Sequence, residues 1–567
     1  MQSNTLANRT MGQTDWSSIN WKKANRIVRN LRQRIFKAAK AGDLKKVRQL
    51  QKLMLRNYSN TLVSVRRVTQ ANAGKYTAGV DRVIVKTPEA RSRLIDEVQK
   101  HQSWRIQPAR RVYIPKANGK QRPLGIPTIL NRVHQARVKN ALEPEWESRF
   151  ECCSHGFRPG RGCHDAIMHV YSLSKSIGRR KWVVDADIKG AFDNISHDFL
   201  LKAIGDFPAK ELIRQWLKAG YVDKNVFHET TAGTPQGGII SPLLANIALH
   251  GLEAALGVHR QKSGSPISPR AVVRYADDFV VFCDTQEIAE QTINELQVWL
   301  SERGLSLSEE KTRIVHLTEG FDFLGFNIRL YRNASSKAGL KPLVKPSKES
   351  IRKLKDRLRA EWKSLHGSNA LAVVHRMTPI IRGWANYFRI GNSKQTFKLL
   401  DMHMFNKAVQ WAKRQHRNKA WNHISNKYWG QWNKYRNDKW VFGDKETEIY
   451  LEKFSWFSIK RHVMVKGASS KDDPSLREYW LKREFRGLSD LTKDKRILMA
   501  KQRCLCPHCG QSLLDGEQIF DTHLIEDKKN PEREQLENRR LVHFYCHQQI
   551  LKAASKMRPA KQEVLCR

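Results

Sequence analysis

Residues 274–283, RYADDFVVFC, place two adjacent aspartates between two runs of residues that are typical of buried β-strands. Neighbouring carboxylates repel each other and resist burial, so the fold has to offset their charge. One interpretation is a hairpin turn that is merely acidic, because aspartate tolerates tight turns. The other is a binding site for metal ions, with Asp277 and Asp278 as ligands.

A third carboxylate favours the metal interpretation. Asp187 ends the apolar run KWVVDAD (181–187), which predicts a strand that leads towards a helix with Ser196 as its N-cap. Two magnesium ions about 3.5–4 Å apart can bind the attacking and leaving oxygens of a phosphoryl transfer, and they need several converging carboxylates. Asp187, Asp277 and Asp278 would supply that set, although an incidental acidic turn fits the same pattern.

The composition indicates a multidomain protein with a polyanionic partner. The chain has 567 residues, of which 40% are hydrophobic, enough for several packed cores. Its 102 Lys and Arg exceed its 55 Asp and Glu by 47, an excess usually explained by binding to nucleic acid. The sequence shows neither an apolar run as long as a membrane span nor a secretory signal, and its nine cysteines do not resemble an extracellular disulfide framework. We therefore expect a cytoplasmic protein with no membrane partner.

Two further stretches suit contacts with nucleotides or RNA. Residues 110–127, RRVYIPKANGKQRPLGIP, predict a hairpin whose basic side chains suit a triphosphate or a phosphodiester backbone, although a basic hairpin is often plain surface. Residues 346–450 predict basic helices rich in tryptophan. Trp411 and Trp421 either stack on unpaired bases or belong to the core of these helices.

The C-terminal segment predicts a zinc site. Cys506-x-x-Cys509 and His543-x-x-Cys546 have the spacing of four ligands around a tetrahedral structural Zn²⁺. Cys504 is a nearby alternative ligand, and free cytosolic thiols are the alternative to a metal site.

Six stretches together resemble the sequence blocks of the reverse transcriptases encoded by mobile group II introns, in the same order and with similar spacing. They read IPKANGKQRPLGIP, HGFRPGRGCHDA, DADIKGAFDNISH, GTPQGGIISPLLANIALHGLE, RYADDFVVFC and GLSLSEEKTRIVHLTEGFDFLGF. RGWANYFR (382–389) is similar to the thumb of maturases in this family, and the C-terminal segment is similar to an HNH endonuclease. The resemblance covers nearly the whole chain.

The resemblance implies an α+β fold. It would be a right-hand polymerase with fingers, a palm built on an antiparallel sheet and a helical thumb, followed by a small zinc-knuckle domain of the ββα-metal, HNH-like type. The expected order is a basic helical N-terminal extension with the start of the fingers (1–100), fingers and palm (101–345), a thumb or maturase domain (346–450), a DNA-binding region (451–495) and the zinc-binding HNH-like domain (496–567).

The resemblance also implies roles for individual residues. Asp187, Asp277 and Asp278 become the catalytic ligands of two Mg²⁺ ions, with the carbonyl of Ile188 as a further ligand. Phe192 occupies the aromatic position that closes against the sugar and selects deoxynucleotides, or else is an ordinary core residue. Nucleotide, template and primer contacts are implied for Lys116, Arg122, Gln236 and Lys311.

In the C-terminal segment, the resemblance makes His523 and His547 candidate ligands of a catalytic metal ion, one Mg²⁺, and Asn538 the residue that holds the motif together. The chain departs from the family at Leu524, where a histidine doublet is common. A leucine in the position of the general base can neither accept a proton nor bind a metal ion, so this assignment predicts weak or no DNA cleavage.

The function implied is that of a multifunctional intron-encoded protein. It would assist the splicing of its own group II intron RNA and copy that RNA, with deoxynucleoside triphosphates, from a primer at the target DNA. We expect it in a bacterial cytoplasm, associated with the nucleoid, rather than in an organelle. The alternative is an RNA-binding splicing factor whose polymerase and nuclease centres are unused. A retron-like or diversity-generating reverse transcriptase would not explain RGWANYF or the zinc segment.

Overall fold

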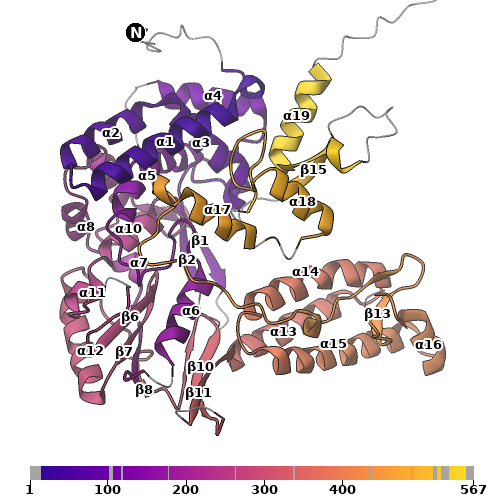
Figure 1. Ribbon diagram of the computed structural model, residues 1–567. Helices are drawn as coiled ribbons and strands as arrows, with labels where there is room; N and C mark the ends of the chain where they lie inside the picture. The colour runs from indigo at the N-terminus through magenta and orange to yellow at the C-terminus, as the bar shows by residue number, and fades with distance from the viewer. Residues whose placement is uncertain are drawn as a thin grey trace, which may run out of the picture.

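The chain forms a helical N-terminal layer, a central sheet, a long helical arm and a C-terminal unit that lies beside the N-terminal layer (Figure 1). This computed structural model describes residues 14–100, 106–115, 119, 121–175, 178–261, 264–335, 339–433, 436–486, 488, 491–514, 520–524 and 535–556. Lys116, predicted to contact the nucleotide, lies outside these residues. Among the described residues, we find no helix with the length and apolar character needed to cross a membrane.

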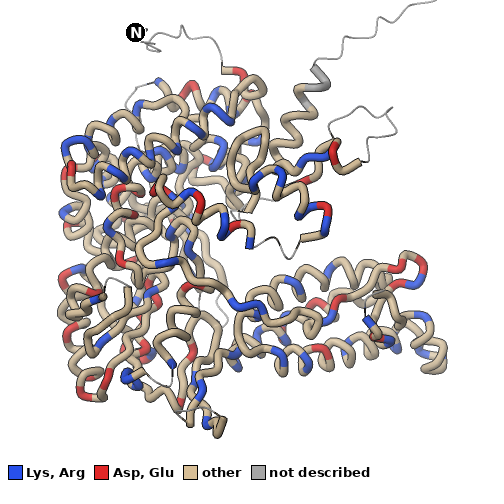
Figure 2. Tube along the Cα trace, in the orientation of Figure 1, with Lys and Arg blue, Asp and Glu red and all other residues tan. Residues whose placement is uncertain are grey.

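Helices build the N-terminal layer. They are η1 (Trp16–Ser18), α1 (Trp21–Lys40), α2 (Leu44–Arg56), α3 (Tyr58–Arg66), η2 (Arg67–Ala71), η3 (Ala73–Tyr76), α4 (Pro88–Gln99) and α5 (Ile129–Glu147). Of these, α1 and α2 are strongly amphipathic and α5 is buried along most of its length. Asn20 caps α1 by accepting a hydrogen bond from the Lys23 N–H at 2.9 Å. Val28, Leu31 and Ile35 of α1 recur at helical spacing on its buried side, and α1 packs on α5. Figure 2 shows Lys and Arg spaced along the length of α1 and α2.

The predicted basic hairpin is confirmed. β1 (Ala109–Pro115) and β2 (Gln121–Ile126) pair antiparallel, with Ile114 opposite Arg122. β1 also pairs in parallel with β4 (Tyr221–Asp223), which pairs with β5 (Val226–His228), so this sheet has the order β2-β1-β4-β5. Arg122 therefore lies near the tip of a hairpin anchored by a third strand.

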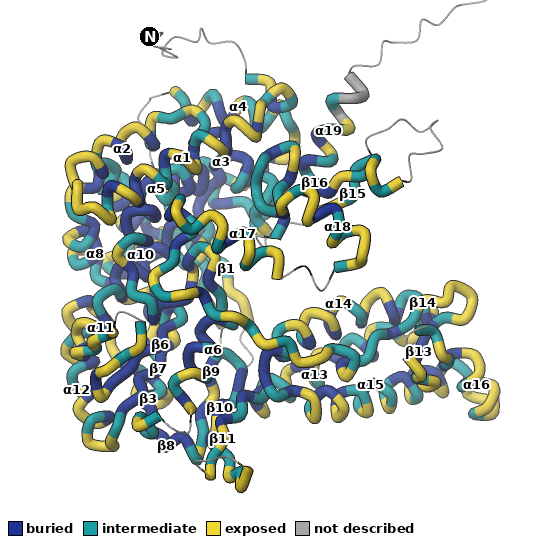
Figure 3. The backbone as a smooth tube through the Cα atoms, in the orientation of Figure 1, coloured by how far each residue is buried: buried dark blue, intermediate teal, exposed yellow. Residues whose placement is uncertain are grey.

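The central sheet carries both acidic stretches. β3 (Trp182–Asp187), β6 (Arg270–Tyr275), β7 (Asp278–Cys283) and β8 (Arg313–His316) pair antiparallel in the order β6-β7-β3-β8. Figure 3 shows these strands largely buried. Alternate side chains enter two cores, since Val184 and Val281 pack with α12 and its neighbours, whereas Val183 and Val280 pack with α6.

Short helices surround the central sheet. They are α6 (Cys163–Leu173), α7 (Ala191–Asn194), α8 (His197–Ile204), α9 (Lys210–Leu217), α10 (Ser241–Ala248), α11 (Leu252–Ala255) and α12 (Gln286–Ser301). Ser196 caps α8 by accepting a hydrogen bond from the Phe199 N–H, as the sequence predicts. The one-turn helix α7, which the sequence analysis does not anticipate, lies between β3 and this cap.

A second sheet leads into the helical arm. Its strands β9 (Phe321–Phe323), β10 (Phe326–Arg332) and β11 (Leu340–Pro346) have the order β11-β10-β9. The arm contains α13 (Lys348–Ser364), α14 (Ala370–Phe388), α15 (Lys394–Gln415), α16 (Trp421–Tyr428), β12 (Trp429–Gly430), β13 (Val441–Asp444) and β14 (Ile449–Tyr450). Figure 1 shows the arm projecting away from the central sheet.

The two tryptophans singled out in the arm have different environments. Trp411 is only 2% exposed, and its indole N–H donates a hydrogen bond to the Leu365 carbonyl at 2.9 Å. Trp411 is therefore a core residue and not a stacking platform for bases. Trp421 is half-buried and lies parallel to the exposed Trp440, with ring centroids 6.5 Å apart.

From the arm, residues 451–486, here called the return segment, run back to the N-terminal layer. They include η4 (Phe454–Trp456), η5 (Pro474–Leu476) and α17 (Arg477–Arg486). The buried carboxylate of Asp165 accepts hydrogen bonds from His462 Nε2 (3.0 Å), the Val465 N–H (2.8 Å) and Arg483 Nη2 (2.8 Å). These hydrogen bonds hold the return segment against α6.

The C-terminal unit (residues 491–556) contains α18 (Lys493–Lys501), β15 (Phe520–Leu524), η8 (Leu536–Asn538), β16 (Arg539–His543) and α19 (Phe544–Lys556). β15 and β16 pair antiparallel, and α19 packs against both strands. Figure 1 places this unit next to α3 and α4.

Candidate functional sites

One backbone register brings the predicted carboxylates together. Asp187, the last residue of β3, pairs directly across the sheet with Asp278, the first residue of β7. Tyr275 pairs with Asp278, so Ala276 and Asp277 form the two-residue turn between β6 and β7. Ala276 adopts a left-handed conformation with φ of 58°. This tight turn holds Asp277 beside the cross-strand pair.

The positive charge of neighbouring protein groups does not fully offset the negative charge of the three carboxylates. Burial, and then the charges of Asp277 and Asp187, raises the pKa of Asp278 to about 7. Burial, followed by the charge of Asp187, also raises the pKa of Asp277. Lys311 Nζ lies 2.6 Å from Asp187 Oδ2, and this hydrogen bond raises the pKa of Lys311. Although its carboxyl group is partly desolvated, residue Asp278 still reaches the solvent, so a divalent cation can approach it.

Buried residues behind the turn support it, and sequence reasoning missed them. Arg274 is 1% exposed, and its Nη1 donates hydrogen bonds to Asn246 Oδ1 and to the Ala276 carbonyl, both at 3.2 Å. Gly156 packs so closely that a Cβ there would lie 2.4 Å from the Ala276 nitrogen. Arg274 and Gly156 stand inside quoted sequence blocks, but nothing in the local pattern distinguishes a buried arginine from a surface one.

A polar chain lies next to the carboxylates. Arg122 Nε donates a hydrogen bond to Gln236 Oε1 at 3.0 Å, and Gln236 Nε2 donates to Asp193 Oδ2 at 3.3 Å. The structure thus joins the basic hairpin, the Gly-rich turn and α7 through two of the predicted nucleotide-contacting residues. Asp193 was not predicted, although it adjoins Phe192.

Phe192 and Ile188 are both buried. Phe192 is 7% exposed, its ring lies edge-on to Phe157 with centroids 6.2 Å apart, and its carbonyl accepts a hydrogen bond from the Thr234 N–H. Ile188 follows Asp187 and forms an isolated antiparallel bridge with Leu307. The loop that contains Phe157 therefore contacts the Phe192 ring and holds it in position.

The predicted zinc ligands converge. The ligand atoms of Cys506, Cys509, His543 and Cys546 all lie within 4.8 Å of one another, and all four residues are buried. His543 Nδ1 lies 3.3 Å from Cys509 Sγ and 3.8 Å from Cys546 Sγ, separations that suit ligands about 2.0–2.3 Å from one zinc ion.

Two residues beside the predicted zinc site help to identify its ligands. His543 Nε2 donates a hydrogen bond to the Ser512 carbonyl at 3.1 Å, which leaves Nδ1 for a metal ion. Cys504 is not part of the four-residue cluster, and burial raises the pKa of its thiol to about 11. Cys506, Cys509, His543 and Cys546 therefore fit a tetrahedral zinc site, and Cys504 is not among its ligands.

Of the nuclease-like residues, His523 and His547 meet where α19 packs against β15. The rings of His523 and His547 have centroids 5.2 Å apart, and His547 Nδ1 lies 3.0 Å from Asp521 Oδ2. Burial, then the positive charges of His547 and Arg540, lowers the pKa of His523, which favours the neutral imidazole. Asn538 ends η8 immediately before β16.

The strand geometry places Leu524 apart from the two histidines. Successive side chains of a strand point to opposite faces, so Leu524 lies on the face of β15 opposite to Asp521 and His523. Leu524 therefore does not occupy a position on the histidine face. Asp521, which the sequence analysis missed, stands two residues before His523, and that strand spacing could have identified it.

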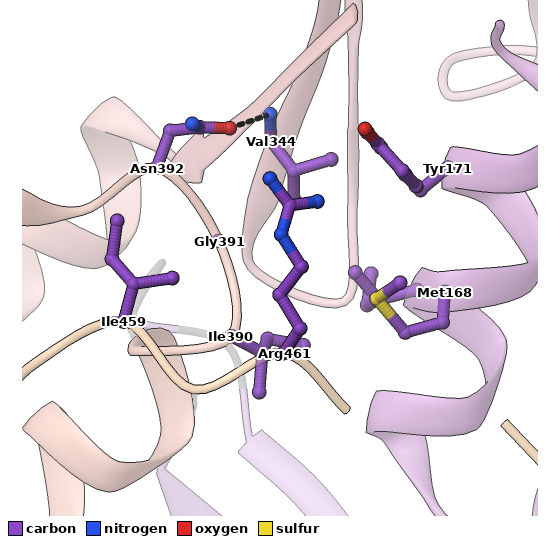
Figure 4. A pocket seen from close by; sticks show the side chains of 9 residues that line it. Met168, Tyr171, Val344, Ile390, Gly391, Asn392, Ile459 and Arg461 are labelled. Carbon is purple, nitrogen blue, oxygen red and sulfur yellow. Dashed lines mark hydrogen bonds between the residues drawn. The ribbon is translucent and has the colours of Figure 1, made fainter. Parts of the chain in front are cut away.

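A small pocket lies apart from both sites, where α6 meets β11, the end of α14 and the return segment (Figure 4). Its lining residues are Ile167, Met168, Tyr171, Val344, Ile390, Gly391, Asn392, Ile459 and Arg461. Asn392 Oδ1 accepts a hydrogen bond from the Val344 N–H at 3.3 Å. None of the predicted site residues lines this pocket, which is a junction between the central body and the arm.

Models of three protein families match consecutive parts of the chain. They are "Reverse transcriptase (RNA-dependent DNA polymerase)" over residues 114–328, "N-terminal domain of reverse transcriptase" over 16–98, and "Group II intron, maturase-specific domain" over 351–429. The first match contains all three carboxylates, and the third covers most of the helical arm.

Two bacterial proteins are similar to much of this chain. Protein YkfC of Escherichia coli is 36% identical over 311 residues, which cover 48% of this chain and 81% of YkfC. The group II intron-encoded protein LtrA of Lactococcus lactis is 31% identical over 411 residues, which cover 57% of this chain and 67% of LtrA. A solved telomerase from Candida albicans is 14% identical, with a TM-score of 0.33 over 57% of this chain and 60% of its own.

The fold and the carboxylate cluster, together with these matches, define an RNA-directed DNA polymerase of the reverse transcriptase class. The chain belongs to the family of group II intron-encoded proteins, which combine reverse transcriptase and maturase domains. Its activities are accordingly reverse transcription and assistance to RNA splicing, and its partner is RNA.

Proposed function

We propose that this protein copies its own group II intron RNA into DNA at a two-magnesium centre held by Asp187, Asp277 and Asp278. The observation that carries this proposal is the cross-strand pair of Asp187 and Asp278, with Asp277 in the adjoining turn. Magnesium bound there would activate the primer hydroxyl and neutralise the leaving pyrophosphate. The carbonyl of Ile188 is the further ligand in this proposal.

The neighbouring residues are proposed to position the nucleotide and the primer. Arg122 supplies a charge for the triphosphate, together with Lys116, while Gln236 lines the nucleotide and template pocket. Phe192 excludes a ribose 2′-hydroxyl, which selects deoxynucleotides. Lys311 balances the charge of Asp187 on the primer side.

The proposed architecture is a right-hand polymerase with an added C-terminal domain. Residues 1–100 form the N-terminal extension and the start of the fingers, 101–345 the fingers and palm, 346–450 the thumb or maturase domain, 451–495 a DNA-binding region and 496–567 an HNH-like domain with structural zinc. The antiparallel central sheet and the helical arm support this division.

We propose intron RNA, target DNA and deoxynucleoside triphosphates as the partners. The net charge of +47 supports RNA and DNA binding, because basic side chains displace the counterions condensed on phosphates. The bacterial relatives YkfC and LtrA support a bacterial cytoplasm as the compartment.

A second activity, cleavage of a DNA strand, is proposed for the C-terminal unit. His523, His547 and Asp521 supply a neutral imidazole and potential ligands for one Mg²⁺, which is the set of groups that metal-assisted hydrolysis needs. Asn538 would hold the η8–β16 junction. Because Leu524 stands where a second histidine would supply a general base, this cleavage is proposed to be weak.

Primer extension tests the polymerase proposal. Purified protein with poly(rA), oligo(dT), dTTP and Mg²⁺ should synthesise DNA, and the double variant Asp277→Ala/Asp278→Ala should fall to background while binding RNA as the wild type does. Glu290→Ala, which removes an exposed carboxylate from α12, is the control and should remain active. Synthesis by the double variant would contradict the assignment, and an inactive wild type that still promotes splicing would support the splicing-factor alternative.

A further inference from the structure

The C-terminal unit shares a hydrophobic core with the N-terminal layer, although the two are separated by most of the chain. Trp16, Trp21 and Val65 pack in one cluster with Met499 and Cys546. Polar contacts cross the same boundary. Asn25 Nδ2 donates a hydrogen bond to the Cys509 carbonyl at 2.8 Å, and Gln549 Nε2 donates to the Trp16 carbonyl at 3.1 Å.

Arg66, the last residue of α3, reaches from the N-terminal layer to the predicted zinc site. It is 5% exposed, and its Nη2 donates a hydrogen bond to Cys546 Sγ at 2.8 Å. Its guanidinium lies between two rings, 4.2 Å from the centroid of Trp21 and 4.5 Å from that of Tyr545. This stacking fixes the plane of the guanidinium so that it faces the sulfur.

The charges explain why a buried arginine is stable at this position. Among the residues that the structure describes, no carboxylate forms an ion pair with Arg66. With zinc bound, three cysteine thiolates, one neutral histidine and Zn²⁺ would together carry one negative charge, which the buried guanidinium would neutralise.

We propose that Arg66 is an outer-sphere partner of the zinc centre, and that zinc loading holds helices α1 and α3 against the C-terminal unit. This inference rests on the proposed zinc site. Because the coupling is reciprocal, zinc should stabilise the N-terminal helices, and removal of the Arg66 contact should weaken zinc binding. The metal would thereby join the first and last parts of a polymerase whose central sheet lies between them in the sequence.

Zinc retention in the full-length protein tests the role of Arg66. Bound zinc is measured by mass spectrometry, and its release is followed with the chromophoric chelator 4-(2-pyridylazo)resorcinol. Wild type should hold one zinc ion per chain, and Arg66→Gln should release it about 10-fold to 100-fold faster, the usual effect of losing an outer-sphere partner. Arg66→Lys should be intermediate. Arg56→Gln, which removes an exposed arginine at the end of α2, should match the wild type.

Hydrogen exchange of the wild-type protein supplies a second readout that does not depend on a variant. Removal of zinc should increase exchange in peptides from 21–40 and 58–66, and should leave α12 unchanged. Two outcomes would overturn the inference while leaving the zinc site intact. One is that Arg66→Gln releases zinc at the wild-type rate, and the other is that hydrogen exchange in these peptides does not change when zinc is removed. A wild-type protein without zinc would instead overturn the zinc site, and the inference with it.

Discussion

At the residue scale, the carboxylates proposed to be catalytic lie where they repel one another most strongly. Asp278 pairs with Asp187 and adjoins Asp277, and its pKa of about 7 expresses the cost of that arrangement without metal. Uncompensated negative charge of this kind is expected at a cation-binding site. Carboxylates that were already neutralised by protein contacts would bind magnesium less strongly.

The stability of the magnesium-free protein should depend on Asp278. Its folded-state pKa of about 7 exceeds the unfolded value of about 3.9, so the folded state binds the extra proton between these values and loses stability as the pH rises through that window. Asp278→Asn should therefore raise the stability at pH 8 by about 1 kcal/mol, a value reduced by solvent exposure of the side chain. The gain should shrink at pH 5.5.

Thermal melts in magnesium-free buffer at both pH values measure this difference. Glu290→Gln, which alters an exposed carboxylate of α12, should show no such pH-dependent gain. An equal effect of Asp278→Asn at pH 8 and at pH 5.5 would contradict the assignment of the raised pKa to Asp278.

Sugar selection should depend on Phe192. Phe192→Val removes the ring that packs against Phe157 and opens space beside the sugar, so ribonucleotide incorporation should rise roughly 10-fold or more relative to deoxynucleotides. Single-nucleotide incorporation kinetics measure the ratio. Phe207→Val, in a buried residue before α9, is the matched control. Unchanged selectivity in Phe192→Val would make Phe192 an ordinary core residue.

At the element scale, the face on which a side chain lies decides its role. On β15, Asp521 and His523 share the face that meets His547, whereas Leu524 lies on the other face. On α15, Trp411 points into the arm and bonds to the Leu365 carbonyl, so its indole is not available to RNA. Residue type alone does not distinguish these faces.

The side chains that share one face of β15 indicate which substitutions should affect DNA cleavage. In ribonucleoprotein assembled on the intron RNA that encodes the protein, His523→Ala and His547→Ala should abolish nicking of a labelled insertion-site duplex. Leu524→Ala should retain nicking, because residue 524 does not contact the histidine face. Loss of nicking in Leu524→Ala at unchanged zinc content, or nicking that survives His547→Ala, would contradict this site.

At the scale of the whole molecule, the return segment, which continues from the arm, is held on the polymerase body by buried ion pairs and hydrogen bonds. Asp165 of α6 accepts three hydrogen bonds from this segment, and Arg32 of α1 contacts both Glu143 (2.8 Å) and Asp472 (2.6 Å). Burial alone would raise the pKa of Asp165, but the hydrogen bond and charge of His462 and the charge of Arg483 lower it to about 2. The carboxylate therefore stays ionised in the folded protein.

Asp165→Ala should release the return segment. The change leaves Arg483 without its buried counter-charge, so the free energy of unfolding should fall by about 3 kcal/mol, and protease should cleave within 457–486 first. Urea unfolding and limited proteolysis measure the two effects. Asp322→Asn, an exposed position on β9, is the control. Wild-type stability and protection in Asp165→Ala would show that the segment is held by other contacts.

The sequence by itself determined the family of this protein and the candidate ligands of its sites, because ligand types at short spacing and strand periodicity are local properties. The adjacent aspartates, the two zinc half-sites and the basic hairpin were all predicted, and the family blocks identified the polymerase class. Only the tertiary structure decided which distant groups meet. The pairing of Asp187 with Asp278 and the contact of Arg66 with Cys546, 480 residues apart, depend on the packing of whole elements, which no local pattern encodes.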